Sequence, residues 1–350
     1  MQSAMLATRS VRVVAVPLLL AGLASGVSPV TAAAARPGLP GPAASRATYG
    51  DLLGVAATSA RGAWAVGYVG NSATLILRWS GTAWKRVPSP SPVASQLSAV
   101  AATSASNAWA VGFSFDQAGY KTLIERWNGT SWKKVPSPNP GPQPELSGVA
   151  ATSARNAWAV GGNLILHWNG TVWKRVPSPA DTALSSVAAT SARNAWAVGG
   201  DQILRWNGKT WRQVASPSPA GSSLSGVAAT SARNAWAVGS AGGKTLILRW
   251  NGKVWKRVPS PSPGTSRGLS SVAATSATSA WAVGFIATKT ASKTLILRWN
   301  GKTWSKVASP TPGPGAGLSG VSATTARNAW AVGGSFPKTV ILRWNGTAWK

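Results

Sequence analysis

The stretch LSGVAATSARNAWAVGSAGGKTLILRWNGKVWKRVPSPSP, from Leu224 to Pro263, decides the fold because close copies of it fill most of the 350-residue chain. The copies align on the tryptophan of AWAVG. These seven tryptophans follow one another at steps of 45, 49, 38, 40, 45 and 49 residues: Trp64, Trp109, Trp158, Trp196, Trp236, Trp281 and Trp330. A theme that recurs with a period in the forties is typical of stacked supersecondary units. We therefore expect one continuous array of repeats.

Each copy carries two further tryptophans. One stands in RWNG or a variant of it, and the other always follows five residues later: Trp79 and Trp84, Trp127 and Trp132, Trp168 and Trp173, Trp206 and Trp211, Trp250 and Trp255, Trp299 and Trp304, and Trp344 and Trp349. These positions, with the first, account for all 21 tryptophans. A buried indole removes about 150–250 Å² from water, so we expect these side chains mainly to pack neighbouring repeats together.

The repeat contains four short apolar runs, LSGVAAT, AWAVG, TLILRW and TWKRV or close variants, each of strand length. SARN or a variant separates the first two runs, and Asn-Gly, a strong hairpin signal, separates the last two except in the first copy, which has Ser80-Gly81. A four-stranded sheet with two apolar faces must be covered by its neighbours. The pattern predicts an all-β chain forming a seven-bladed β-propeller of four-stranded antiparallel blades, with repeats starting near residues 52, 97, 146, 184, 224, 269 and 318.

The first 51 residues are expected to lie outside the propeller. Residues 1–35 have the pattern of a secretory signal peptide, with Arg9 and Arg12 before the apolar run Val13–Val27 and small-residue cleavage sites at Ala32–Ala35. Residues 36–51 form a leader rich in Pro, Gly and Ala, and residues 52–350 form the propeller. We therefore expect an exported protein, secreted or associated with the cell wall, with no transmembrane segment once the signal is removed.

The layout WAVGG followed by ILRWNGKTW, from Trp196 to Trp211, resembles that of kelch repeats. The shared features are the glycines after the second strand, the aromatic residue that ends the third, the tight turn and the tryptophan after it. The whole unit, over Leu52–Lys350, is similar to tandem repeats of uncharacterised secreted bacterial proteins. The resemblance implies a propeller and no particular activity. The Gly-His and Trp-Asp pairs of WD40 repeats do not occur in the sequence.

The loops between the second and third strands carry the variation in length. The third repeat has only Gly161-Gly162-Asn163 there, whereas the second inserts GFSFDQAGYKT. These loops and the Pro- and Ser-rich connections between blades are expected to emerge on one face, and variable loops on a rigid scaffold are where binding usually occurs. Either the aromatic residues there finish the second strand or they form a binding surface for a ligand, with these candidate residues: Tyr68, Phe113, Phe115, Asp116, Tyr120, Phe285 and Phe336.

The basic residues follow the repeat, and the formal net charge is +29. Arginine occurs in the SARN turns, and the outermost strands carry pairs of cations that are candidates for binding a polyanion: Lys85 and Arg86, Lys133 and Lys134, Lys174 and Arg175, and Lys256 and Arg257. On a rim, such charges either discourage sheet edges from pairing or attract an anionic polymer. No motif that reads bases is evident, so sequence-specific nucleic-acid binding is not expected.

The composition contains few residues that could serve in catalysis. The chain has no cysteine, six acidic residues and one histidine, His167, which stands where the other copies have arginine. We expect no catalytic residue, no metal site and no cofactor. The acids are spread over different blades; only Glu145 and Asp181 precede adjacent first strands, and solvated loop acids are the simpler interpretation. The Asn-Gly-Thr sequences are explained by the hairpin turn rather than by glycosylation.

Three functions remain open at this point. The leading hypothesis is a monomeric, non-catalytic binding or scaffold propeller that recognises an extracellular or cell-surface glycan or protein through its variable loops. The first alternative is attachment to an anionic cell-wall polymer through the basic rim. The second is a hydrolase or lyase built on the propeller, which would need acids or His167 to meet at one loop face.

Overall fold

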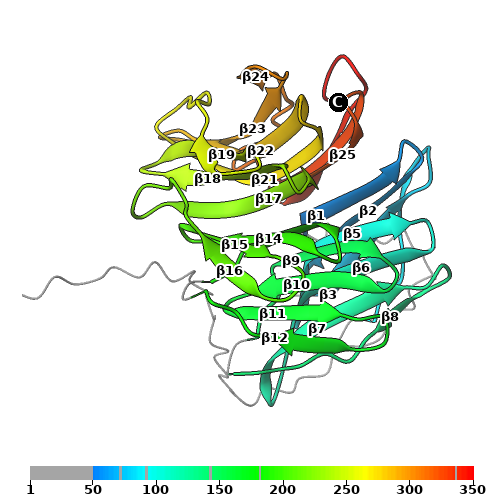
Figure 1. The fold of residues 1–350 in the computed structure, drawn as a ribbon. Coiled ribbons are helices and arrows are strands. Elements are labelled where there is room, and N and C mark those ends of the chain that lie inside the picture. The colour runs from blue at the N-terminus through cyan, green and yellow to red at the C-terminus, as the bar shows by residue number, and fades with distance from the viewer. Residues whose placement is uncertain (1–49, 71–72, 91–93, 142–143, 181–182, 336) are drawn as a thin grey trace, which may run out of the picture. The chain divides into compact units, whose positions relative to one another are not determined.

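The computed structural model describes residues 50–350 except 71–72, 91–93, 142–143, 181–182 and 336 (Figure 1). The described residues from Gly50 onward belong to one compact unit. The predicted signal peptide, most of the predicted leader, Asp181 and Phe336 therefore lie outside the described residues.

The described residues contain strands and no helix, so none of them forms a helix able to cross a membrane. The first strands of the blades are β1 (Gly50–Ser59), β5 (Ser95–Ser104), β9 (Gly148–Ser153), β13 (Ser186–Ser191), β17 (Ser223–Ser231), β21 (Ser266–Ser276) and β25 (Gly317–Thr325). The second strands are β2 (Gly62–Val69), β6 (Asn107–Asp116), β10 (Asn156–Gly161), β14 (Asn194–Gly199), β18 (Asn234–Ala241), β22 (Ser279–Ala287) and β26 (Asn328–Ser335).

The outer strands complete each blade. The third strands are β3 (Ala73–Trp79), β7 (Gly119–Trp127), β11 (Leu164–Trp168), β15 (Gln202–Trp206), β19 (Lys244–Trp250), β23 (Ser292–Trp299) and β27 (Lys338–Trp344). The fourth strands are β4 (Trp84–Arg86), β8 (Trp132–Lys134), β12 (Trp173–Val176), β16 (Trp211–Val214), β20 (Trp255–Arg257) and β24 (Trp304–Val307).

Each blade is a meander of antiparallel strands in chain order, as the sequence predicts. In the fifth blade, Trp236 lies opposite Arg249, and Trp250 lies opposite Trp255 across the Asn-Gly turn. Six blades have four strands, and in the seventh the position of the fourth strand is held by a bridge between Trp344 and Trp349. The prediction of a seven-bladed propeller of antiparallel blades is confirmed.

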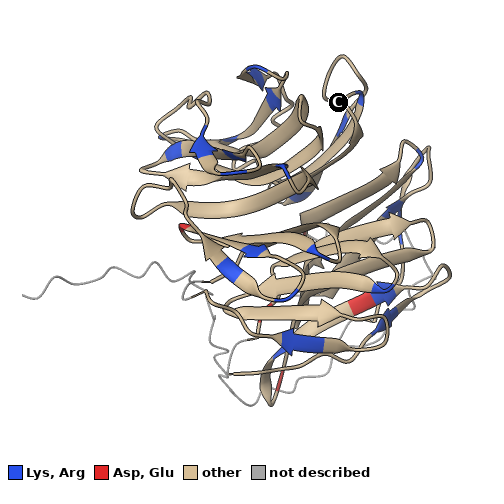
Figure 2. Ribbon diagram, in the orientation of Figure 1, with Lys and Arg blue, Asp and Glu red and all other residues tan. Residues whose placement is uncertain are grey.

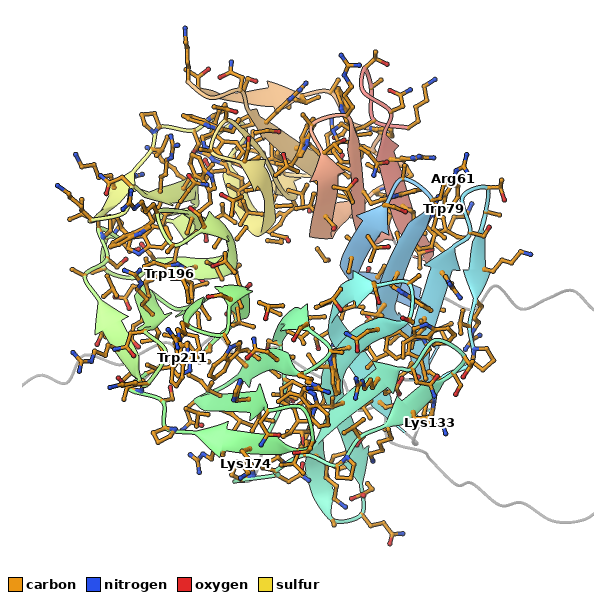
Figure 3. The ribbon with its side chains drawn as sticks, turned by 45° about the vertical axis from the view of Figure 1, so that its right-hand side comes forward. Arg61, Trp79, Lys133, Lys174, Trp196 and Trp211 are labelled. Atoms are coloured by element: carbon orange, nitrogen blue, oxygen red, sulfur yellow. The ribbon has the colours of Figure 1, made fainter. Side chains whose placement is uncertain are left out.

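The first strands surround a central channel, visible as the opening in Figure 3. A bulge follows the first leucine of β17, where pairing steps from Leu224–Gly239 to Gly226–Val238. The bulged position lines the channel and is serine in every blade except the first, which has Leu53. Serine, glycine and valine therefore make up most of the channel lining, and the channel encloses about 140 Å³.

Tryptophan side chains hold adjacent blades together. The indole of Trp196, on the fourth blade, lies 5.0 Å from that of Trp250 and 5.1 Å from that of Trp255, both on the fifth. The same arrangement of one second-strand indole against two indoles of the next blade occurs at every boundary. The expectation that the tryptophans pack between blades is confirmed.

The ring closes through this same packing. Trp330 of the seventh blade lies 4.9 Å from Trp79 and 5.0 Å from Trp84 of the first. Gly50 and Asp51 begin β1 and pair with β2. The sequence analysis placed Gly50 and Asp51 in the leader, whereas the structure places them in the first strand of the first blade, because their backbone pairs with the end of β2. Side-chain packing, rather than a shared blade, therefore joins the ends of the described ring.

Candidate functional site

The variable-loop face, formed by the loops between second and third strands and the connections between blades, carries one aromatic cluster. In the second blade the long insert extends β6 and β7 into a hairpin. Tyr120 lies 5.6 Å from Phe113 and 5.0 Å from Phe115, ring centre to ring centre. Phe115 is 46% exposed, an unusual value for so large an apolar side chain. These three predicted residues thus lie together at the tip of one blade.

Asp116, at the end of the same hairpin, is already engaged. Its carboxylate accepts a hydrogen bond of 2.6 Å from Nζ of Lys121 and another of 2.9 Å from the backbone N–H of Ala118. These contacts lower the pKa of Asp116, the bond from Lys121 having the largest effect. The pair fixes the hairpin tip, and Asp116 is ionised at neutral pH.

The remaining predicted aromatics do not join this cluster. Tyr68 lies near the end of β2 and is half-buried, and Phe285 lies near the end of β22 and is 39% exposed. Phe285 borders a separate hollow of about 250 Å³ together with Asp51, whose pKa is raised by burial. Phe336 lies outside the described residues. The described aromatics lie within strands, in agreement with the simpler interpretation of the sequence. Among them, a cluster forms only in the second blade.

The opposite end of the blades is cationic. We call the turns between first and second strands, the turns between third and fourth strands and the fourth strands themselves the cationic end. All eight predicted rim cations are exposed, and Figure 3 shows Lys133 and Lys174 at the periphery of the ring. The turns add further exposed cations: Arg61, Arg155, Arg193, Arg233 and Arg327, and Lys209, Lys253 and Lys302.

Acidic residues are segregated from this end. Figure 2 shows few acidic segments among many basic ones on the ribbon. Asp51, Asp116, Glu145 and Asp201 lie on or next to the variable-loop face, and Glu125 is buried within the second blade. Within the described ranges no acid lies at the cationic end, and the described residues form one ion pair, Lys121–Asp116, at the other end. Among the described residues, the exposed cations of the cationic end therefore form no salt bridge, although Lys134 lies opposite the buried Glu125 in the sheet.

Third-strand arginines have a structural role that sequence reasoning missed. The guanidinium of Arg249 lies 5.0 Å from the ring centre of Trp236 and 5.4 Å from that of Trp299 on the next blade. The other third-strand arginines lie between the equivalent indoles at similar distances: Arg78, Arg126, Arg205, Arg298 and Arg343. The sequence did hold a signal, because each stands directly before a tryptophan. These arginines therefore pack between the indoles of neighbouring blades.

His167 takes the same place in the third blade. Its ring stacks on Trp158 at 4.2 Å, and Nε2 lies 2.9 Å from Oδ1 of Asn156. Burial lowers the pKa of His167, so the ring is neutral at pH 7. The interpretation of His167 as a variant of the arginine position agrees with these contacts.

The acids do not assemble into a recognisable catalytic or metal site among the described residues. No group of three His, Cys, Asp or Glu side chains is placed to hold a metal ion in that part of the chain. Glu145 lies before β9, and burial raises its pKa. Its suggested neighbour Asp181 is outside the described residues, so their approach stays a prediction.

Comparison with known proteins supports the fold. No family model and no curated protein sequence matches the chain. Among solved structures, YCF48 bound to D1 peptide is similar over 85% of this chain and 94% of its own, with a TM-score of 0.59 and 16% identity. YCF48 from Cyanidioschyzon merolae matches 87% of this chain and 97% of its own, with a TM-score of 0.58 and 18% identity.

A third solved structure, the WD40 repeats of RRP9, covers 81% of this chain and 87% of its own, with a TM-score of 0.61 and 13% identity. A propeller of WD40-like type is thus supported, although the sequence lacks the WD40 dipeptides. The kelch repeat type stays a prediction. At these identities the similarity concerns the fold, so the argument for function depends on the two faces of this ring.

Proposed function

We propose that the chain is an exported, non-catalytic binding propeller that attaches to an anionic polymer through its cationic end. The observation that carries the proposal is the segregation of charge: exposed cations recur from blade to blade, and no described acid lies among them. Release of counterions from a polyanion would drive such binding without requiring a pocket on each blade.

The contacts of the titratable residues support a non-catalytic role in this proposal. Asp116 is paired with Lys121, Glu125 lies in the apolar interior, and His167 is stacked on Trp158. The proposed protein acts as a monomer, because one ring already presents many cations.

The class of polymer follows from the expected location. The signal-peptide pattern of residues 1–35 supports export. Outside the cell, acidic polysaccharides and anionic cell-wall polymers are the available polyanions. N-terminal sequencing of the protein recovered outside the cells tests export: the proposal expects a mature chain that begins close to Ala35. An uncleaved chain retained in the cells would contradict it.

The polymer proposal is tested by retention of the mature protein on immobilised heparin and on teichoic acid in a salt gradient. We expect elution only at high salt. A variant with Arg155→Gln, Arg193→Gln and Arg233→Gln should elute markedly earlier. A matched variant with Lys244→Gln, Lys293→Gln and Lys338→Gln loses the same charge at the other end and should elute nearly as the parent does. Equal shifts for both variants would show a diffuse charge effect and contradict a binding face.

A second candidate function is favoured by the aromatic cluster of the second blade. In this proposal, Phe113, Phe115 and Tyr120 recognise an extracellular glycan or protein. Aromatic rings with an exposed apolar face suit both kinds of ligand, and the similar YCF48 structure is one bound to a peptide. Phe115→Ala should abolish binding on a glycan or peptide array without lowering the melting temperature, whereas Phe285→Ala, outside the cluster, should not. Unchanged binding by Phe115→Ala would exclude this function.

A further inference from the structure

In most blades, an asparagine at the start of the second strand forms a hydrogen bond with the basic side chain of the third strand. That side chain is histidine in the third blade and arginine in the others. In the second blade, Nδ2 of Asn107 donates to Oγ1 of Thr103 at 2.8 Å, and its Oδ1 accepts from Nη2 of Arg126 at 3.3 Å. The same bridge recurs in four other blades through Asn156, Asn194, Asn234 and Asn328. In these blades the basic side chain therefore has an acceptor within its own repeat.

The first blade departs from this arrangement. Gly62 stands at the asparagine position, so Arg78 lacks that acceptor. The guanidinium is still held 5.2 Å from the ring centre of Trp64 and 5.3 Å from that of Trp127, but it makes no hydrogen bond to any described residue. Its nitrogens are not among the buried polar atoms that lack a partner. Arg78 is thus fixed in place with donors that a ligand can reach.

A hollow of about 560 Å³ lies where the asparagine side chain is missing. Four cations line it, and no acid does: Arg61, Arg78, Lys85 and Arg86. Hydroxyl groups of Thr58, Ser59 and Ser80 add polar atoms, and the indole of Trp79 borders the hollow. Figure 3 shows Arg61 and Trp79 close together on the first blade. The hollow thus concentrates positive charge and hydrogen-bond donors on one side of one blade.

We propose that this hollow is a specific site for one phosphate or sulfate ester group, a tetrahedral oxyanion, with Arg78 as its fixed donor. A guanidinium offers paired N–H donors that match two oxygens of such a group. Stacking on the two indoles fixes the side chain before the ligand arrives, so little rotamer freedom is lost on binding. The inference rests on the proposed function, because it assigns one defined site to a surface that otherwise binds polymer through distributed charge.

The sixth blade provides the matched comparison. Ser279 stands at its asparagine position, and Arg298 is stacked on Trp281 and Trp344 as Arg78 is on its own pair. However, Thr278 and Ser305 replace the cations equivalent to Arg61 and Lys85. A third-strand arginine without an asparagine partner therefore occurs there without the surrounding cluster of charge.

The test uses Gly62→Asn, which installs the asparagine of the other blades and leaves the net charge unchanged. Gly62 has no positive φ, and an added Cβ would meet only side-chain hydroxyl oxygens, of Thr58 at 2.9 Å and of Ser59 at 3.4 Å. The other blades accommodate the same Asn–Thr contact, so the variant should fold. The control is Ser279→Asn in the sixth blade, and a second variant, Arg78→His, copies the third blade. Retained melting temperatures establish that each variant is folded.

Calorimetric titration with inorganic tripolyphosphate and with sucrose octasulfate reads out the site and distinguishes a phosphate from a sulfate source. We expect one site in the mature protein for at least one of these probes. Its affinity should be weakened about tenfold or more by Gly62→Asn and by Arg78→His and unchanged by Ser279→Asn. Wild-type affinity in Gly62→Asn, or equal weakening in Ser279→Asn, overturns the site.

The two proposals can fail separately. If Gly62→Asn binds both probes as the parent does while retention on teichoic acid or heparin remains salt-dependent, the specific site is wrong and the polymer proposal stands. If the parent is not retained on either polymer at low salt, the polymer proposal is wrong, whatever the small probes do. Loss of probe binding together with nearly unchanged polymer retention supports both, because one site contributes little to a distributed surface.

Discussion

Glu125 is the residue least suited to its surroundings. It stands in TLIERW, where the other repeats have leucine, and its side chain is 0% exposed. Neither carboxyl oxygen has a hydrogen-bond partner. Burial raises the pKa of Glu125 to about 8, an increase that the charge of Lys134 on the adjacent strand only partly opposes. At neutral pH the group is therefore mostly a protonated carboxylic acid inside an apolar interface between blades.

This placement predicts that the protein loses stability as pH rises. The pKa is about 8 in the folded chain against 4.5 normally, so the penalty is absent below about pH 4.5, grows as the pH rises and is complete above about pH 8. The difference corresponds to an upper bound of about 5 kcal/mol. Urea unfolding from pH 5 to 8.5 should show this decline, and Glu125→Leu should raise the free energy of unfolding and flatten the curve. A Glu125→Leu curve with the parent's slope would contradict the assignment.

Arg249 illustrates how a cation can serve packing rather than binding. Besides its two indole contacts, it donates from Nη2 to the carbonyl oxygen of Ala277 on the next blade at 3.1 Å. Arg249→Ala should therefore lower the free energy of unfolding by about 1–2 kcal/mol. The control is Arg233→Ala, because Arg233 is exposed on the same blade and should change stability by less than about 0.5 kcal/mol. Equal effects in urea titrations would show that the stacked geometry contributes nothing.

At the scale of the element, the strands could be predicted from the sequence because a repeated pattern shows which positions stay apolar. The partners of those positions across a blade boundary could not, because they depend on how one blade is rotated against the next. Gly62 and Arg78 show the difference. They lie 16 residues apart in the sequence, and their significance follows only from the Asn–Arg bridges of other blades. Likewise, the predicted aromatics that the structure describes share a face, yet only three of these meet.

At the boundary between the seventh and first blades, the packed side chains are less buried than at the other boundaries. Leu77, Trp79 and Trp84 are only partly buried there, whereas their equivalents in the fifth blade, Leu248, Trp250 and Trp255, are at most 4% exposed. This boundary should therefore open before the others.

Native-state hydrogen exchange followed by mass spectrometry tests this order of opening. Amides of β3 and β27 should exchange faster than those of β19, the internal reference strand, because opening of the closing boundary exposes them without global unfolding. The prediction concerns relative rates within one molecule, so the overall stability of the sample does not affect it. Equal protection of β3, β19 and β27 would show that all boundaries open together.

The ring places its cationic end and the acids of the variable-loop face at opposite ends of the strands. A second strand such as β18 has eight residues, which at about 3.3 Å per residue spans roughly 25 Å. The Debye length at physiological ionic strength is about 8 Å. An anionic polymer at the turns of the cationic end is therefore screened from the described acids of the variable-loop face, although the charge of Lys134 on β8 reaches Asp116. The variable-loop face can remain available while the polymer is bound.

This separation predicts the footprint of a bound polymer. With teichoic acid or heparin present, hydrogen exchange should slow in the turns around Arg155, Arg193 and Arg233 and along the fourth strands, because a bound chain excludes water and restricts their opening. The hairpin of Phe115 and Tyr120 should exchange as it does in the free protein. Protection of the hairpin with unchanged turns would place the polymer on the variable-loop face and contradict the assignment. Protection of the turns alone would leave the aromatic cluster free for a second ligand, so attachment and recognition could occur at opposite ends of one ring.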